Sequence, residues 1–169
     1  MPPRSKPSDI FNGQVVYATQ QGLETGLIQT LAQDKVEWSG RFGSGWVSAT
    51  MGQETEVKYL AGRGVPWHTH PDGDPHLSLE DWILFLLDPA ETLLLATSSH
   101  LRLYHKLHLA NIDFFSRRTG LTGQISWSLK VARFGKFLSQ SQQIQDPYHF
   151  SEVKLCQDLE ITVENGKKF

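Results

Sequence analysis

Apolar and polar residues alternate over residues 101–109, where the chain reads Leu-Arg-Leu-Tyr-His-Lys-Leu-His-Leu. This period of two predicts a β-strand with one covered face, because successive side chains of a strand point to opposite sides. The leucines share the covered face with His105, and the opposite face carries Arg102, Tyr104, Lys106 and His108. The apolar run at residues 92–97 predicts a second, central strand.

A helix is predicted from Ser78 to Leu87, a segment that is apolar on most sides. Ser78 is a favoured residue for the N-terminal cap of a helix. Asp88 precedes Pro89, and a residue before proline disfavours the helical conformation, so the helix is expected to end there. Weaker helical patterns occupy residues 110–118 and 129–142.

The remaining segments carry shorter signals. The type of the element at residues 10–18 is left undetermined by its sequence. Residues 23–31 are apolar and compatible with a strand. Residues 38–46 contain three glycines and indicate a loop. Further strands are predicted at residues 47–50, 55–61 and 159–163. Together these elements predict an α/β fold (an α+β sandwich) with a central mixed sheet flanked by helices.

Length and composition set the broad class. The 169 residues predict one domain over residues 10–169, preceded by a flexible tail at residues 1–9. A net charge of −2 makes nucleic acid an unexpected partner. No apolar stretch has the length of a signal peptide or a membrane span, so no membrane association and a cytoplasmic location are expected. The single cysteine, Cys156, excludes an internal disulfide and a multi-thiolate zinc site.

Two histidines and an aspartate follow one another at a spacing suited to metal binding. His68 and His70 lie two residues apart at the expected end of a strand, where a period of two directs both imidazoles to one side. Asp81 lies in the first turn of the helix that Ser78 begins, where the helix dipole favours a carboxylate. The loop at residues 71–77 contains two prolines and a glycine and can fold back. A catalytic zinc ion commonly takes three protein ligands, so His68, His70 and Asp81 are candidate ligands.

Each half of this pattern also has an ordinary structural explanation. A His-x-His pair occurs on many strand surfaces without binding anything. Ser78 and Asp81 have the spacing of a capping box, with Asp in the place of the usual Glu or Gln. The two roles are compatible, because a capped turn can still carry a metal ligand. The joint spacing, His-x-His-x7-Ser-x2-Asp, is what favours a metal site.

That joint spacing resembles the signature of the prokaryote-type JAMM (MPN-plus, JAB-domain) zinc metallopeptidases, which His68, His70, Ser78 and Asp81 all match. The resemblance covers roughly residues 15–110. It implies a cytidine-deaminase-like architecture, one Zn²⁺ per chain with a bound water, and an upstream glutamate. Glu24, in Glu-Thr-Gly-Leu-Ile, is the preferred match for that glutamate. Its rivals are Glu37, Glu54 and Glu56.

The resemblance also implies an activity, hydrolysis of a peptide or isopeptide bond. Glu24 would act as general base and then acid, and Ser78 would donate a hydrogen bond to the oxyanion. The short stretch between Glu24 and His68 favours a compact, deubiquitinase-like isopeptidase that acts at the C-terminal tail of a ubiquitin-like or sulfur-carrier protein. Two alternatives are a RadC-like protein linked to DNA repair and a non-catalytic binding module that contains zinc.

Overall fold

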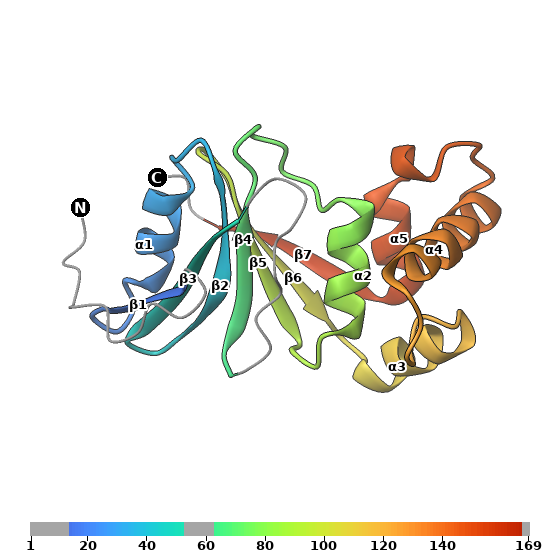
Figure 1. The fold of residues 1–169 in the computed structure, drawn as a ribbon, viewed down its shortest axis with the longest axis horizontal. Helices are drawn as coiled ribbons and strands as arrows, with labels where there is room; N and C mark the ends of the chain where they lie inside the picture. The colour runs from blue at the N-terminus through green and yellow to red at the C-terminus, as the bar shows by residue number, and fades with distance from the viewer. Residues whose placement is uncertain (1–13, 53–62, 167–169) are drawn as a thin grey trace. The chain divides into compact units, whose positions relative to one another are not determined.

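The computed structural model describes residues 14–52 and 63–166, and its helices and strands are drawn in Figure 1. The strands of these residues are β1 (Gln14–Ala18), β2 (Glu37–Gly43), β3 (Trp46–Gly52), β4 (Val65–Thr69), β5 (Thr92–Ala96), β6 (Leu101–Lys106) and β7 (Ile161–Asn165). The helices are α1 (Glu24–Leu31), α2 (Leu79–Leu87), α3 (Leu109–Arg118), α4 (Trp127–Gln142), the 3-10 helix η1 (Pro147–His149) and α5 (Glu152–Leu159). The expected tail at residues 1–9 and the expected strand at residues 55–61 lie outside the described residues.

The strands are hydrogen-bonded in the order β1-β3-β2-β4-β5-β6-β7. β1 with β3, β3 with β2, and β2 with β4 are antiparallel, whereas β4 and β5 are parallel. This mixed sheet, together with the helices, confirms the predicted α+β class. Within the part of the chain that the structure describes, no helix is both long and apolar enough to cross a membrane.

The chain divides into two compact units. The first unit comprises Met1–Pro75, Thr92–Leu103 and Glu164–Phe169, and the second comprises His76–Glu91 and Tyr104–Val163. In the first unit, α1 contacts β2 and β3, and it lies along the strands in Figure 1. The buried side chains between them form its core, a set that includes Tyr17, Leu27, Ile28, Val47, Ala49, Trp67, Leu94 and Leu101.

The strand expected at residues 23–31 is wrong, because this segment is helix α1. Leu27, Ile28 and Leu31 recur at helical spacing, and they pack into the core of the first unit. Gly22, just before the helix, has a positive φ of 95°, a conformation that glycine adopts readily and that lets the chain turn into α1. The apolar run is too short for its period alone to separate a strand from a helix.

The loop expected at residues 38–46 is also wrong, because residues 37–43 form strand β2. Gly40 lies against β3 so closely that a Cβ atom there would come within 1.8 Å of the Ser48 carbonyl oxygen. A glycine inside a strand therefore marks a close approach of two backbones at this position. Gly45, with a φ of 83°, supplies the turn into β3.

The second unit contains helices α2 to α5. The helices expected at residues 78–87, 110–118 and 129–142 are confirmed as α2, α3 and α4. Helix α5 was not predicted; it contains Cys156, whose side chain is buried. Trp82 and Phe85 each pack edge to face with Tyr104, at ring-centroid distances of 5.6 and 6.4 Å, which joins α2 to β6.

Strand β6 is confirmed, but the face predicted to be polar and uncovered is largely buried. Tyr104 is 0% exposed and Lys106 is 5% exposed. The Lys106 ammonium donates a hydrogen bond of 2.6 Å to the Asp88 carbonyl oxygen and lies 4.4 Å from the centre of the Phe85 ring. Burial lowers the pKa of Lys106 to about 8. A period of two shows only that successive side chains point in alternating directions. It does not show that the polar face is exposed, because a hydrogen-bond acceptor and an aromatic ring can cover a residue such as Lys106.

Candidate metal centre

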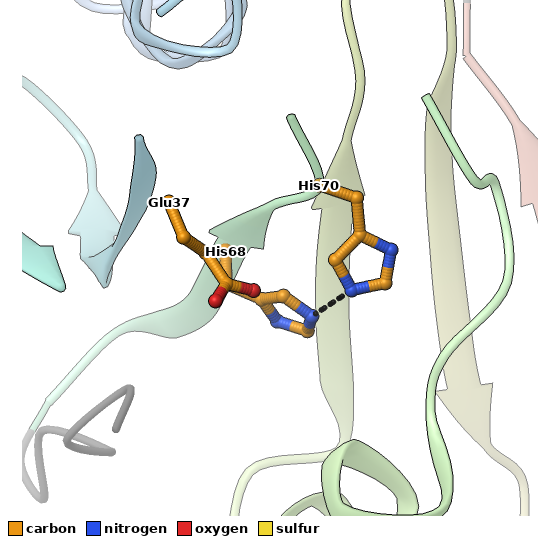
Figure 2. Close-up of side chains that lie close together, drawn as sticks. All are labelled: Glu37, His68 and His70. Atoms are coloured by element: carbon orange, nitrogen blue, oxygen red, sulfur yellow. Dashed lines mark hydrogen bonds between the residues drawn. The ribbon is translucent and has the colours of Figure 1, made fainter. Parts of the chain in front are cut away.

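The two histidines meet at the end of β4, on one side of the strand. His68 is 2% exposed and pairs across the sheet with Ser39 of β2. His70 follows the strand, and its backbone N–H donates to the Ala96 carbonyl oxygen at 3.1 Å. The two Nε2 atoms lie 3.2 Å apart, with the rings tilted by 57° (Figure 2). The prediction that both imidazoles point the same way is confirmed.

A tight turn fixes the orientation of the His70 ring. The Nδ1 atom of His70 lies 2.9 Å from the Asp74 carbonyl oxygen. A carbonyl oxygen only accepts, so Nδ1 donates in this contact, and a neutral His70 ring then has the lone pair on Nε2. The turn closes through a hydrogen bond from Gly73 N–H to the His70 carbonyl oxygen, at 3.1 Å. Histidine ligands of metals commonly donate their second N–H in this way, which holds the ring and raises its basicity.

Glu37 is the acid that lies with these histidines. One oxygen of its carboxylate and one nitrogen from each of His68 and His70 all lie within 4.8 Å of one another (Figure 2). The register explains the meeting: Ser39 faces His68 across antiparallel strands, so residue 37 comes opposite residue 70 and on the same face. Glu37 is only 8% exposed, which is uncommon for a carboxylate without a partner or a function.

This donor set fits a metal ion. Two ligand nitrogens of a tetrahedral zinc site are about 3.3 Å apart when each bond measures about 2.0–2.1 Å. The observed separation of the Nε2 atoms is 3.2 Å. The contact between the two Nε2 atoms is a hydrogen bond (Figure 2), and a metal ion would take the place of the proton that the two nitrogens share. Glu37, His68 and His70 could therefore hold a metal ion, with nitrogen and oxygen ligands of the kind that zinc accepts.

Ser78 and Asp81 form the capping box that their spacing predicts. The Asp81 N–H donates to the Ser78 Oγ at 3.1 Å, and the Ser78 N–H donates to the Asp81 Oδ2 at 3.0 Å. A carboxylate has two oxygens with several acceptor positions, so this cap does not exhaust the capacity of Asp81 to bind a cation. Both residues belong to the second unit and the histidines to the first, so ligation by Asp81 stays a prediction.

Glu24 has a structural task at the start of α1. Its Oε1 accepts a hydrogen bond of 2.8 Å from Gly45 N–H, and its Oε2 accepts one of 2.8 Å from Gly22 N–H. These bonds tie the helix to the turn between β2 and β3. The bond from Gly45, above all, holds the pKa of the Glu24 carboxyl below its ordinary value of 4.5, against the opposing effect of burial. The acid found with the histidines is Glu37.

Replacing Glu24 with Gln is expected to lower the free energy of unfolding by about 1–3 kcal/mol near neutral pH, because hydrogen bonds to a charged acceptor are lost. The folded-state pKa is depressed, so this contribution is complete above 4.5 and disappears as the pH falls through the lowered pKa. Urea unfolding at neutral and acidic pH measures it. Glu91→Gln, at an exposed position, is the control. Equal stability of Glu24→Gln and wild type at neutral pH would contradict the assignment.

The sequence analysis preferred Glu24 to Glu37, because the glycines of β2 indicated a loop where the structure has a strand. The useful signal was the glutamate at the head of an alternating segment, Glu-Trp-Ser-Gly-Arg-Phe-Gly, but it becomes decisive only when β2 is paired with β4. The rivals Glu54 and Glu56 lie outside the described residues.

The function of this site has to follow from its own residues. The chain matches no protein-family model, no curated protein and no solved structure.

Proposed function

We propose that this chain is a zinc-dependent peptidase of the JAMM kind, which hydrolyses a peptide or isopeptide bond. The observation that carries the proposal is the convergence of Glu37, His68 and His70, with a buried carboxylate beside two imidazoles at a metal-binding separation. A purely structural zinc site is usually closed by four protein ligands of nitrogen and sulfur type. A site of histidines and carboxylates is more typical of catalytic metals, which keep a position for water.

Asp81 is the third ligand in this proposal, with His68 and His70. Its helix-terminal position favours the ionised carboxylate. When bound, zinc supplies a Lewis acid that makes a water molecule reactive near neutral pH. The hydrogen bond from His70 Nδ1 to Asp74 holds one ligand nitrogen in position for that role.

Glu37 takes the proton-transfer role that the sequence assigned to Glu24. Its carboxylate lies within reach of the two ligand histidines, where it can accept a proton from the attacking water and pass it to the leaving amine. Ser78 donates to the oxyanion of the tetrahedral intermediate. In the cap its hydroxyl oxygen serves as an acceptor, which does not use the hydroxyl proton.

The proposed substrate is the C-terminal tail of a ubiquitin-like or sulfur-carrier protein. This substrate class is the one that the resemblance to JAMM metallopeptidases implies. The test uses such proteins fused through their C-terminal tails to a reporter, incubated with zinc-loaded wild type. Cleavage at the tail junction is expected to stop when zinc is removed by a chelator and to return when zinc is restored. Stoichiometric zinc with no cleavage of any fusion would instead support the non-catalytic module.

A further inference from the structure

Two buried hydroxyl groups lie on the face of the sheet that carries the histidine pair. Ser39 of β2 is 4% exposed and Thr50 of β3 is 9% exposed. Neither the Ser39 Oγ nor the Thr50 Oγ1 has a hydrogen-bond partner among the residues that the structure describes. A buried hydroxyl without a partner is costly, and almost every buried polar group in a folded protein is hydrogen-bonded. Two such groups on one face therefore indicate that something else binds there.

Strand pairing brings the two hydroxyls together beside His68. β2 lies between β3 and β4, with Ser39 opposite Thr50 on one side and opposite His68 on the other. Directly opposed residues of antiparallel strands share a face, with their Cβ atoms about 4.5–5.5 Å apart. Glu37, two residues before Ser39 in β2, points to the same face. All four residues belong to the first unit, and Ser39 has the shortest side chain, so its hydroxyl forms the floor between the other three.

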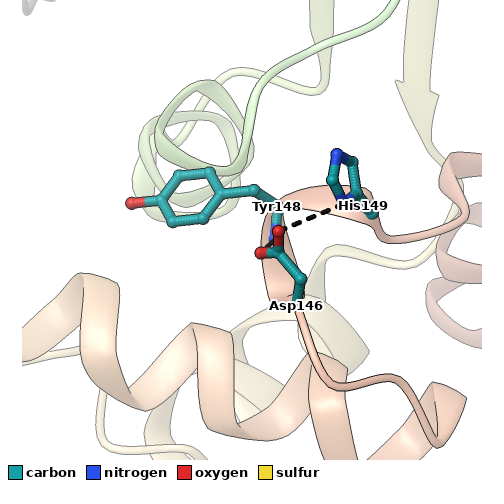
Figure 3. A network of polar contacts seen from close by, with 3 residues as sticks. All are labelled: Asp146, Tyr148 and His149. Atoms are coloured by element: carbon teal, nitrogen blue, oxygen red, sulfur yellow. Dashed lines mark hydrogen bonds and ion pairs between the residues drawn. The ribbon is translucent and has the colours of Figure 1, made fainter.

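Other polar groups are satisfied by partners within the chain. On the same face, the Ser48 hydroxyl accepts a hydrogen bond of 3.1 Å from Arg41 N–H and donates one of 3.2 Å to the Arg41 carbonyl oxygen. At the surface of the second unit, Asp146 Oδ1 accepts from Tyr148 N–H at 3.0 Å, and Asp146 Oδ2 pairs with His149 Nδ1 at 3.1 Å (Figure 3). The facing hydroxyls of β2 and β3 do not bond even to one another. A group that satisfies both has to lie between them.

We propose that the Ser39 and Thr50 hydroxyls bind one ordered water molecule, which holds the Glu37 carboxylate in position for proton transfer. A buried water makes about three hydrogen bonds to polar groups that would otherwise be unsatisfied. The two hydroxyls supply two of them, and the Glu37 carboxylate, with several acceptor positions, supplies the third. Ser39 and Thr50 are thus positioning residues. Their role in proton transfer rests on the proposed function, whereas the water site rests on the sheet alone.

A high-resolution crystal structure of the zinc-loaded wild type tests the water site directly. We expect a water molecule about 2.5–3.0 Å from Ser39 Oγ, from Thr50 Oγ1 and from one oxygen of Glu37. The same water should be present in Thr50→Ser, which keeps the hydroxyl, and lost from Thr50→Val, which keeps the branched shape. Wild-type crystals without a water between the two hydroxyls would overturn the inference and leave the proposed function standing.

Turnover of a tail fusion by the two Thr50 variants separates the hydroxyl from the shape of the side chain. We expect kcat to fall about 10- to 100-fold in Thr50→Val, with KM and zinc content unchanged, because a group that orients a reacting residue is lost. Thr50→Ser should stay within a few-fold of wild type, and Ser39→Ala should resemble Thr50→Val. Ser116→Ala is the matched control, because it removes another buried hydroxyl without a described partner, from α3 of the second unit.

The order of the variants decides the positioning role. If Thr50 acts only through packing, Thr50→Val should be as active as wild type and Thr50→Ser should be impaired, and that order would overturn the role. An equal loss in Ser116→Ala would overturn it as well. A zinc-loaded wild type that contains the water but cleaves no fusion would overturn the proposed function and the role in proton transfer, while the water site would stand. If Thr50→Val does not fold, Ser39→Ala replaces it, and wild-type kcat in that variant would overturn the role.

Discussion

Glu37→Gln is expected to retain zinc and to cleave about 10²- to 10⁴-fold more slowly than wild type, which is the usual contribution of a general acid–base group. The amide has nearly the shape of the carboxylate but cannot accept the proton of the attacking water. Because His68, His70 and Asp81 are unchanged, the metal should stay bound. Turnover of a tail fusion and zinc content, measured on the same preparation, check both halves of this expectation.

Glu24→Gln is the matched control, since it makes the same chemical change at the other candidate glutamate. Its carboxylate is engaged with the backbone of Gly22 and Gly45, so turnover should stay within a few-fold of wild type while stability falls. A folded, zinc-loaded Glu24→Gln without activity would return the catalytic role to Glu24. Loss of zinc from Glu37→Gln would instead make Glu37 a metal ligand.

His70→Ala is expected to abolish zinc binding, whereas the wild type should carry about one zinc ion per chain. The substitution removes one of two nitrogens that lie 3.2 Å apart, and it leaves the carboxylate of Glu37 with a single imidazole. Elemental analysis after dialysis measures the stoichiometry, and circular dichroism confirms that the chain is folded.

His149→Ala controls for the general effect of losing a histidine. His149 is 85% exposed and pairs with Asp146 on the surface, so this variant should bind zinc as the wild type does. Zinc retained at wild-type stoichiometry by His70→Ala would show that the histidine pair is not the binding site, and the hydrolytic proposal would lose its basis.

Local sequence determined the elements whose signals lie within a few residues of one another. Helix α2 is bounded by the Ser78 cap and by Asp88 before proline, and both signals act on the nearest turn of backbone. The period of two placed His68 and His70 on one side of a strand, because side-chain direction in a strand depends on the local backbone alone. These parts of the fold and of the site needed no tertiary information.

Tertiary structure decided the parts that depend on distant pairing. Glu37 reaches the histidines only because β2 pairs with β4, and β2 itself is held by the approach of Gly40 to β3, which no local pattern signals. The buried carboxylate of Glu152 accepts a hydrogen bond from the backbone N–H of Leu77, which is 75 residues earlier in the chain. Period and propensity report the direction of each side chain, whereas the partner it meets is selected by register and packing across the whole chain.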